Sequence, residues 1–332
     1  MPQLSDFDEH FVHQIPEPLG VVGIEHPHWR ESYFFVTHGP TAESDVVVVA
    51  MATYPPRGML DALVLGRVGD ELVFRHYQRP AGRDPHTSTV GPVSVVIEEP
   101  FRRVRVVVDD ADGFDAELTF EARTAAYALR RGRLRDDAGG LLWDQSHMIQ
   151  SGTFLGSYSN GKSGGAVDGW LGQRDHSWGV RDHGRIPMWT WFAIQLPDGM
   201  LGVWHWELAD GAHVFTDGCW AAAGGGDPVP VLSFDHDLHW TDDGGARVNY
   251  GSDGSAVSGL AGTVSCALAD GTTVTVRGEG RWCAPYRPFY GGGQHLMAVE
   301  TDDGRRGTAV YEVTGRHHHC FFPEPLGTDS SP

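Results

Sequence analysis

The segment FDAELTFEA, residues 114–122, places Ala116, Leu118 and Phe120 at every second position, with acidic residues and a threonine between them. A period of two puts alternate side chains on opposite faces of an extended chain. The segment therefore predicts a β-strand that has one face in a core and the other in water.

Similar short runs lie on both sides of this segment, separated by turns rich in Gly, Asp and Pro. Before it they cover residues 32–36, 45–51, 62–65, 71–75, 93–97 and 101–108, and after it 187–195, 201–208, 213–221, 230–240, 259–268, 272–283, 294–301 and 307–314. One short helix is expected, from Ser5 to Gln14. Regularly spaced short strands with few short helices predict an all-β fold, built as antiparallel sandwiches or barrels.

The two series of strands suggest two domains, which 332 residues are long enough to form. Residues 123–170 interrupt the strand pattern, and the Gly- and Ser-rich stretch 160–165 looks like a turn. We therefore predict an N-terminal β domain at residues 1–160, a C-terminal β domain at 161–325 and a flexible tail at 326–332.

Composition narrows the classes of partner. Asp and Glu number 44 against 25 Lys and Arg, a net charge of −19, so nucleic acid and anionic membrane surfaces, which need a cationic footprint, are not expected partners. The first residues, MPQLSDFDEHF, do not look like a signal peptide, and no run approaches the roughly 18 apolar residues of a membrane helix. The cysteines at 219, 266, 283 and 320 form no CxxC pair, which indicates free thiols in a reducing, cytoplasmic setting.

The densest group of ionisable residues is GQRDHSWGVRD, residues 172–182. On an extended strand His176 and Trp178 point to one face while Asp175 and Ser177 point to the other. We interpret the segment as the polar wall of a cavity, with His176, Asp175 and Trp178 as candidate catalytic residues. Ion pairs that stiffen the wall are expected from Arg174, Arg181 and Asp182. The alternative is that Asp175, Arg181 and Asp182 only join the two domains.

Two further acid–histidine groups are candidates. Asp144, beside Trp143 and close to His147, would be a general acid if burial raised its pKa; the alternative is a hydrogen-bonded loop carboxylate. Glu207 and His205 lie two residues apart on one strand and form another candidate acid pair. Their alternative position is the outer face of the strand, in water.

Tryptophan is concentrated in the middle of the chain, where nine of the eleven residues fall between positions 143 and 240. The candidate substrate-binding residues are the aromatic and imidazole side chains of this region: Trp143, His147, Trp189, Trp191, Trp204, His205 and Trp206. The negative face of an aromatic ring stabilises a cation and also fits an apolar chain. The alternative is that these rings only fill the cores of the barrels.

No motif for a nucleotide, a serine nucleophile or a zinc protease occurs in the sequence. Asp235, Asp237 and His239 share one strand face but are expected to be solvated. The run His317-His318-His319 is interpreted as native and structural. No metal and no cofactor are therefore expected.

The motif RDHSWGVRD, with Asp168-Gly169 before it and the strand Trp189-Thr190-Trp191 after it, resembles the carotenoid 1,2-hydratase-like superfamily, which also includes kievitone hydratase-like and AttH-like proteins. The resemblance implies paired lipocalin-like barrels. It also gives His176 and Trp178 a role in adding water to an isoprenoid double bond. Relatives use a Tyr and an Asp on a later strand, where this chain has Trp204-His205-Trp206-Glu207. The Tyr is therefore missing and Glu207 is the only matching carboxylate.

These observations lead to one favoured function and two alternatives. The favoured function is cofactor-independent acid catalysis on a small hydrophobic substrate of the isoprenoid or prenylated class, near the domain junction. A carboxylic acid protonates a C=C bond, Trp rings stabilise the cation, and water, a lost proton or a ring closure ends the reaction. The alternatives are a pericyclic cyclase of a polyene and a non-catalytic terpenoid or lipid carrier. Either a monomer or a homodimer is compatible with the sequence.

Overall fold

The computed structural model describes residues 16–17, 21–83, 87–110, 113–185, 188–208, 210–248, 257–285 and 291–315. Within these residues the chain forms twenty β-strands and one 3₁₀ turn at Pro55–Arg57. The strands build two closed or nearly closed antiparallel barrels, which confirms the predicted all-β fold. The helix predicted from Ser5 to Gln14 lies outside the described residues.

The first barrel is an eleven-stranded sheet with the order β4-β3-β2-β1-β11-β10-β8-β7-β6-β5, in which β9 also pairs with β10. Its strands are β1 (Trp29–His38), β2 (Val46–Tyr54), β3 (Met59–Val68), β4 (Glu71–Pro80), β5 (Thr89–Val90), β6 (Val93–Glu99), β7 (Arg103–Asp109), β8 (Asp115–Ala122), β9 (Tyr127–Arg135), β10 (Leu141–Ser159) and β11 (Gly164–Arg181). The sheet curls until β4 comes back to β5, although no strand pairing joins these two edge strands in the described part of the chain.

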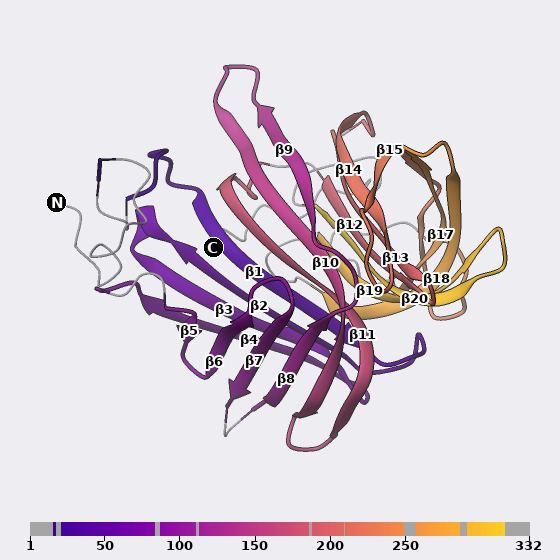
Figure 1. Ribbon diagram of the computed structural model, residues 1–332, viewed down its shortest axis with the longest axis horizontal. Helices are drawn as coiled ribbons and strands as arrows, with labels where there is room; N and C mark the ends of the chain where they lie inside the picture. Colours follow the sequence, from indigo (N-terminus) through magenta and orange to yellow (C-terminus); the bar gives the residue numbers. More distant parts are fainter. Residues whose placement is uncertain are drawn as a thin grey trace.

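The second barrel is a nine-stranded sheet with the order β15-β14-β13-β12-β20-β19-β18-β17-β16. Its strands are β12 (Met188–Leu196), β13 (Gly199–Glu207), β14 (His213–Ala222), β15 (Val229–His236), β16 (His239–Thr241), β17 (Gly259–Leu268), β18 (Thr273–Pro285), β19 (Gly291–Thr301) and β20 (Arg306–Gly315). A further pairing of β15 with β17 closes this sheet. Figure 1 shows the first barrel in indigo to magenta and the second in orange to yellow, with β10 and β11 on the side of the first barrel that lies next to the second.

The change from one sheet to the other falls later than the boundary we predicted at residues 160 and 161. β11 pairs with both β1 and β10, so the first sheet extends to Arg181 and the second begins at Met188. The stretch 160–165, which we predicted to be a turn, does form the turn of the β10–β11 hairpin, but this turn joins two strands of one sheet and does not separate two domains. The motif around His176 therefore belongs to the first barrel.

Alternation along the strands builds the core of the first barrel as predicted. Val104 and Val106 of β7 and Leu118 and Phe120 of β8 are buried, whereas their neighbours in sequence are more exposed. These residues belong to one cluster of buried apolar side chains inside the barrel. Complete burial of such a side chain contributes about 1.5–3 kcal/mol.

β12 and β13 are buried along their whole length, on both faces. One face, which carries Phe192 and Val203, belongs to the core of the second barrel. The opposite face, which carries Trp191 and Trp204, packs with residues of the first barrel in a third core, here called the junction core. Residues 187–195 and 201–208, predicted as strands, thus have two buried faces, and the second face is buried because the other barrel covers it.

The glycine of the RDHSWGVRD motif has a structural role. Gly179 has φ +135°, and a Cβ on this residue would lie 2.1 Å from the Asp144 backbone oxygen on β10. An L-residue rarely adopts this φ, and no side chain fits at this distance. The close pairing of β10 with β11 therefore requires glycine here.

Two buried histidines make the fold sensitive to acid. His38, at the end of β1, is buried and contacts the Gly39 oxygen through Nδ1 at 2.9 Å. His295, on β19, stacks on Trp282 with ring centroids 4.2 Å apart. Burial lowers the pKa of His38 to about 4 and that of His295 to about 3. Both side chains are therefore neutral in the folded protein at pH 7.

We expect His38 alone to cost the protein about 3 kcal/mol of stability as the pH falls from 6.5 to 4, since one pKa unit corresponds to about 1.4 kcal/mol. The unfolded chain takes up a proton on this histidine near its ordinary pKa, and the folded chain does so only near pH 4. Urea unfolding at pH 7 and pH 4 measures the loss. The H38N variant donates the same hydrogen bond without titrating, so it should lose about 3 kcal/mol less. Equal losses in the two proteins would contradict the assignment.

The predicted free thiols agree with the structure where it describes them. Cys219, Cys266 and Cys283 are buried and unbonded to one another, and burial raises the pKa of each thiol. Cys320 lies outside the described residues. No helix in the described part of the chain has the length and apolar composition needed to span a membrane.

Candidate functional site

The two faces of β11 belong to different environments. His176 is opposite Tyr33 of β1, which packs on the core of the first barrel. Asp175 is opposite Phe34, which packs on the junction core. The predicted alternation therefore holds, and His176 and Asp175, although neighbours in sequence, face different cores.

His176 forms a close pair with a carboxylate that the sequence did not single out. Its Nε2 lies 2.7 Å from Oε1 of Glu31 on β1. The imidazole also contacts Tyr33 and Trp178, with ring centroids 4.6 Å and 5.1 Å away. We call Glu31, Tyr33, His176 and Trp178 the His176 cluster.

The His176 cluster is open to solvent at one end. Along this face of β11, Arg174 is 4% exposed and Trp178 is 39% exposed, and the side chain of His176, between them, is 23% exposed. Burial, with the charge of Glu31, raises the pKa of Tyr33, so its phenol stays protonated. The cluster thus combines an imidazole and a carboxylate with two aromatic rings at a site that a ligand can reach.

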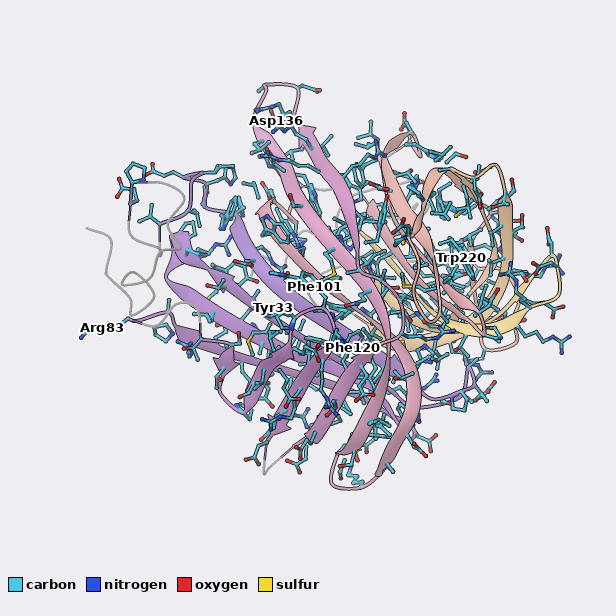
Figure 2. The ribbon with its side chains drawn as sticks, viewed as in Figure 1. Tyr33, Arg83, Phe101, Phe120, Asp136 and Trp220 are labelled. Carbon is cyan, nitrogen blue, oxygen red and sulfur yellow. The ribbon has the colours of Figure 1, made fainter. Side chains whose placement is uncertain are left out.

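Arg174 lies deeper on the same face and bonds to a neutral partner. Its Nε and Nη2 donate to Oε1 of Gln150 at 3.0 and 2.8 Å, and its guanidinium lies over the Phe120 and Phe101 rings, at 5.2 and 6.0 Å. Burial lowers its pKa to about 10, so it remains a cation. Figure 2 labels Phe101 and Phe120, with Tyr33, in this part of the first barrel.

The opposite face of β11 carries a buried acid–histidine pair. Oδ2 of Asp175 lies 3.2 Å from Nε2 of His147 on β10, a close contact with poor hydrogen-bond geometry. Burial lowers the pKa of His147 against the opposing charge of Asp175. The His147 ring meets Trp204 edge-on, with ring centroids 4.0 Å apart. This pair lies within the junction and is less than one tenth exposed.

The expected ion pairs are only partly present, which corrects our prediction for two arginines. Asp182 does pair with Arg185, at 2.7 Å, and approaches His28 at 3.8 Å. Arg181 instead donates to the hydroxyl of Ser177 and lies 5.6 Å from the Trp143 ring. In the described part of the chain no ion pair within 4 Å joins Arg174 or Arg181 to a carboxylate. Arg174 bonds to the neutral Gln150 side chain and Arg181 to the Ser177 hydroxyl.

The candidate substrate-binding tryptophans gather in the junction core. Trp143, Trp189, Trp191, Trp204 and Trp206 are all buried there. Trp143 lies 4.4 Å from Trp206 and 5.8 Å from Trp204 between ring centroids. Trp189 donates to Glu312 at 2.5 Å. The indole N–H groups of the other four have no acceptor among the described residues.

Asp144 does not fit the role of proton donor. It is held by Arg131, whose Nη2 lies 2.8 Å from Oδ2, and by Arg133, whose Nε lies 3.1 Å from the same oxygen. Burial alone would raise the pKa of Asp144, but the bonds and charges of the two arginines outweigh it and the pKa is lowered. The carboxylate therefore stays ionised.

Glu207 and His205 are buried, which excludes their predicted alternative position in water. They lie on the face of β13 that points into the second barrel, where His205 packs 4.8 Å from Phe234. Oε1 of Glu207 lies 3.1 Å from Nε2 of His205. Glu207 is therefore in a different barrel from His176 and is not its acid partner.

Comparison of the sequence with protein-family models gives a match over most of the chain. Residues 4–259 match the model of a family described as "Family of unknown function (DUF8625)". No match was found among curated proteins.

Solved structures that resemble this chain include a protein described as an AttH from Nitrosomonas europaea, with a TM-score of 0.59 and 14% identity over 89% of this chain and 98% of that one. CghA bound to Sch210972 has a TM-score of 0.56 and 12% identity over 87% and 89% of the two chains. Kievitone hydratase from Nectria haematococca has a TM-score of 0.48 and 13% identity over 86% and 88%. The first two of these structures confirm, at the level of the fold, the resemblance seen in the sequence, and a shared fold by itself does not fix a reaction.

Proposed function

This chain belongs to DUF8625, a family of unknown function, and we propose that it is a cofactor-independent acid–base enzyme for a hydrophobic substrate of the isoprenoid or prenylated class. The observation that carries the proposal is the 2.7 Å contact between His176 and Glu31, beside two aromatic rings and within reach of solvent. Glu31 takes the acid role for which Asp144, Asp175 and Glu207 were candidates.

We place the reaction on the first-barrel face of β11 and not in the junction. His147 and Asp175 also form an acid–histidine pair, but each is less than one tenth exposed. His176 is partly exposed and lies above the apolar core of the first barrel. A substrate with an apolar chain would bury that chain against this core and present its double bond to the His176 cluster.

The reaction begins with transfer of a proton from the Glu31 carboxyl to one carbon of the double bond. The π electrons form the new C–H bond and leave a tertiary cation on the other carbon, next to the Trp178 and Tyr33 rings, whose negative faces stabilise it. His176 accepts a proton from a water molecule as its oxygen bonds to the cation, and that proton returns to Glu31. The product is a tertiary alcohol, and the enzyme is unchanged.

The same groups give other products when water is kept out. Loss of a neighbouring proton from the cation to His176 regenerates an alkene, which is an isomerisation. Attack on the cation by a second double bond closes a ring. The choice among these outcomes depends on which nucleophile lies next to the cation.

Arg174 favours pericyclic cyclisation as the second candidate function. It is a buried cation within the same barrel, and its hydrogen-bond partner is the neutral side chain of Gln150. A guanidinium in a site of low dielectric polarises a carbonyl strongly, and this would activate a polyene that carries one. In this mechanism the Glu31–His176 pair transfers no proton to the substrate.

The test is to incubate the protein with a prenylated phenol or an acyclic isoprenoid in water enriched in ¹⁸O and deuterium. We expect the product to carry label from this water. Intrinsic tryptophan fluorescence first selects compounds that bind, and mass spectrometry then follows the bound compounds. Hydration introduces both ¹⁸O and carbon-bound deuterium, while isomerisation or cyclisation through a cation introduces deuterium alone. An unlabelled cyclic product would favour the pericyclic reaction, and binding without any product would indicate a carrier. Either result would contradict the acid–base proposal.

A further inference from the structure

Four side chains with metal-binding atoms meet in the second barrel, away from the His176 cluster. His205 and Glu207 lie on β13, His213 lies opposite Glu207 on β14, and His236 ends β15, three strands that are neighbours in the sheet (Figure 1). Oε1 of Glu207 lies 3.1 Å from Nε2 of His205, 3.0 Å from Nε2 of His236 and 3.9 Å from Nε2 of His213. Three imidazoles thus converge on one carboxylate oxygen.

We propose that His205, Glu207 and His213 form a binding site for a divalent transition metal, with His236 orienting the carboxylate. One ligand atom from each of the three residues lies within 4.8 Å of the other two. In a tetrahedral zinc site with bonds of about 2.0–2.2 Å, neighbouring ligand atoms are about 3.4 Å apart. The pair His205–Glu207 already has this spacing. The side chain of His213 is 49% exposed, and its ring meets the His205 ring edge-on with centroids 4.5 Å apart, so it already lies beside the other imidazole ligand and has solvent on its open side for the small movement it needs.

The hydrogen bonds at Nδ1, the ring nitrogen that does not face Glu207, assign different roles to His236 and His205. The Leu238 backbone N–H donates to Nδ1 of His236 at 3.3 Å, so neutral His236 carries its proton on Nε2 and donates it to Glu207. His236 is therefore a positioning residue, as expected for the hydrogen-bond partner of a ligating carboxylate.

His205 is suited to be a ligand. Its Nδ1 lies 2.7 Å from the hydroxyl of Thr216, and a hydroxyl either donates or accepts. When a metal takes the place of the Nε2 proton, the ring proton moves to Nδ1 and is donated to Thr216. The imidazole is thus held in the orientation that presents a lone pair to the metal.

The donor set identifies the class of ion. Two imidazoles and one carboxylate, with a position left open, are the ligands of catalytic zinc sites and of non-haem iron(II) sites. The exposure of His213 places the open position on the solvent side. The site uses no residue of the His176 cluster, so a test of zinc binding does not depend on whether the proposed proton transfer is correct.

Zinc binding to the full-length protein tests the proposal. The protein is purified without an affinity tag and stripped with a chelator. It carries H317A, H318A and H319A, because that native run of histidines would also bind zinc. We expect one zinc per chain by elemental analysis and a Kd of about 1 µM or tighter by calorimetry. Cobalt(II) bound at the same site should give the visible absorption of a four- or five-coordinate ion.

Single substitutions added to the H317A/H318A/H319A protein locate the zinc site. H213A, at a half-exposed position, should fold normally and weaken zinc binding about a hundredfold or more, and H236Q should weaken it by about 10- to 100-fold. E207Q, checked by thermal unfolding, should also abolish tight binding. H239A is the matched control, because His239 lies three residues after His236 and contacts the Asp237 backbone oxygen. Absence of bound zinc, or equal affinity in H213A and H239A, would overturn the site and leave the histidines as hydrogen-bond partners of a buried carboxylate.

Discussion

Replacing His176 with alanine is expected to lower turnover by about a hundredfold to ten-thousandfold, the usual contribution of a positioned acid–base group. The imidazole contacts Glu31 at 2.7 Å and is the base that activates water in the proposed reaction. Its side chain is partly exposed, so its loss should leave the fold intact. The measurement is kcat/KM for a compound that the isotope experiment shows to be converted, with circular dichroism as the check on folding.

The matched control for this variant is His76→Ala. His76 also belongs to the first barrel, is 27% exposed and lies 3.5 Å from a carboxylate, that of Asp61. H76A should keep turnover close to that of the unmodified protein. If H176A and H76A retained the same activity, His176 would have no part in the chemistry.

Gly179→Ala is expected to destabilise the protein by about 3 kcal/mol or more, or to prevent folding altogether. The added methyl group would lie 2.1 Å from the Asp144 backbone oxygen, and φ at this position is +135°. Relief would require β10 and β11 to move apart, although these strands form the centre of the first sheet. Urea unfolding monitored by tryptophan fluorescence measures the change in the free energy of unfolding.

Gly165→Ala provides the matched control for G179A. It makes the same substitution on the same strand, at a position where no atom lies within 4 Å of the added methyl group. Its stability should change by less than about 1 kcal/mol. A similar effect of both substitutions would show that close packing against β10 is not what requires glycine at position 179.

The alternation of apolar and polar residues along the strands predicted which side chains enter the cores. The pattern at Leu118 and Phe120 matches the core of the first barrel, and the pattern at Trp191 and Phe192 correctly separates two buried faces. Alternation does not say whether a face points to solvent or to another domain. For this reason the side on which His205 and Glu207 lie could not be decided from the sequence.

The partner of His176 could not be predicted because it depends on register between distant strands. Glu31 and His176 are 145 residues apart and meet only because β1 pairs with β11 in one particular alignment. Register also decides the partners of Asp144, although over a short distance in sequence: it meets Arg131 and Arg133, 13 and 11 residues away, through the pairing of β9 with β10. The sequence shows which acidic and basic side chains are present, whereas strand pairing in the sheet decides which of them come into contact.

β11 connects the His176 cluster with the junction core. One of its faces presents His176 to the first barrel, and the other presents Asp175 to the tryptophans of the junction core. The proposed proton-transfer site is thus backed by a layer of large, buried rings. Such packing holds the strand in place and limits movement of the His176 cluster.

The central claim is that Glu31 and His176 act as one unit, and a double-mutant cycle tests it most directly. The measurement is kcat/KM for the unmodified protein, E31Q, H176A and the E31Q/H176A double variant with the same converted substrate. Because residues that act together are strongly non-additive, the double variant should be no slower than the slower single variant by more than about twofold. Losses that multiply across the cycle, or single variants that keep full activity, would contradict the account.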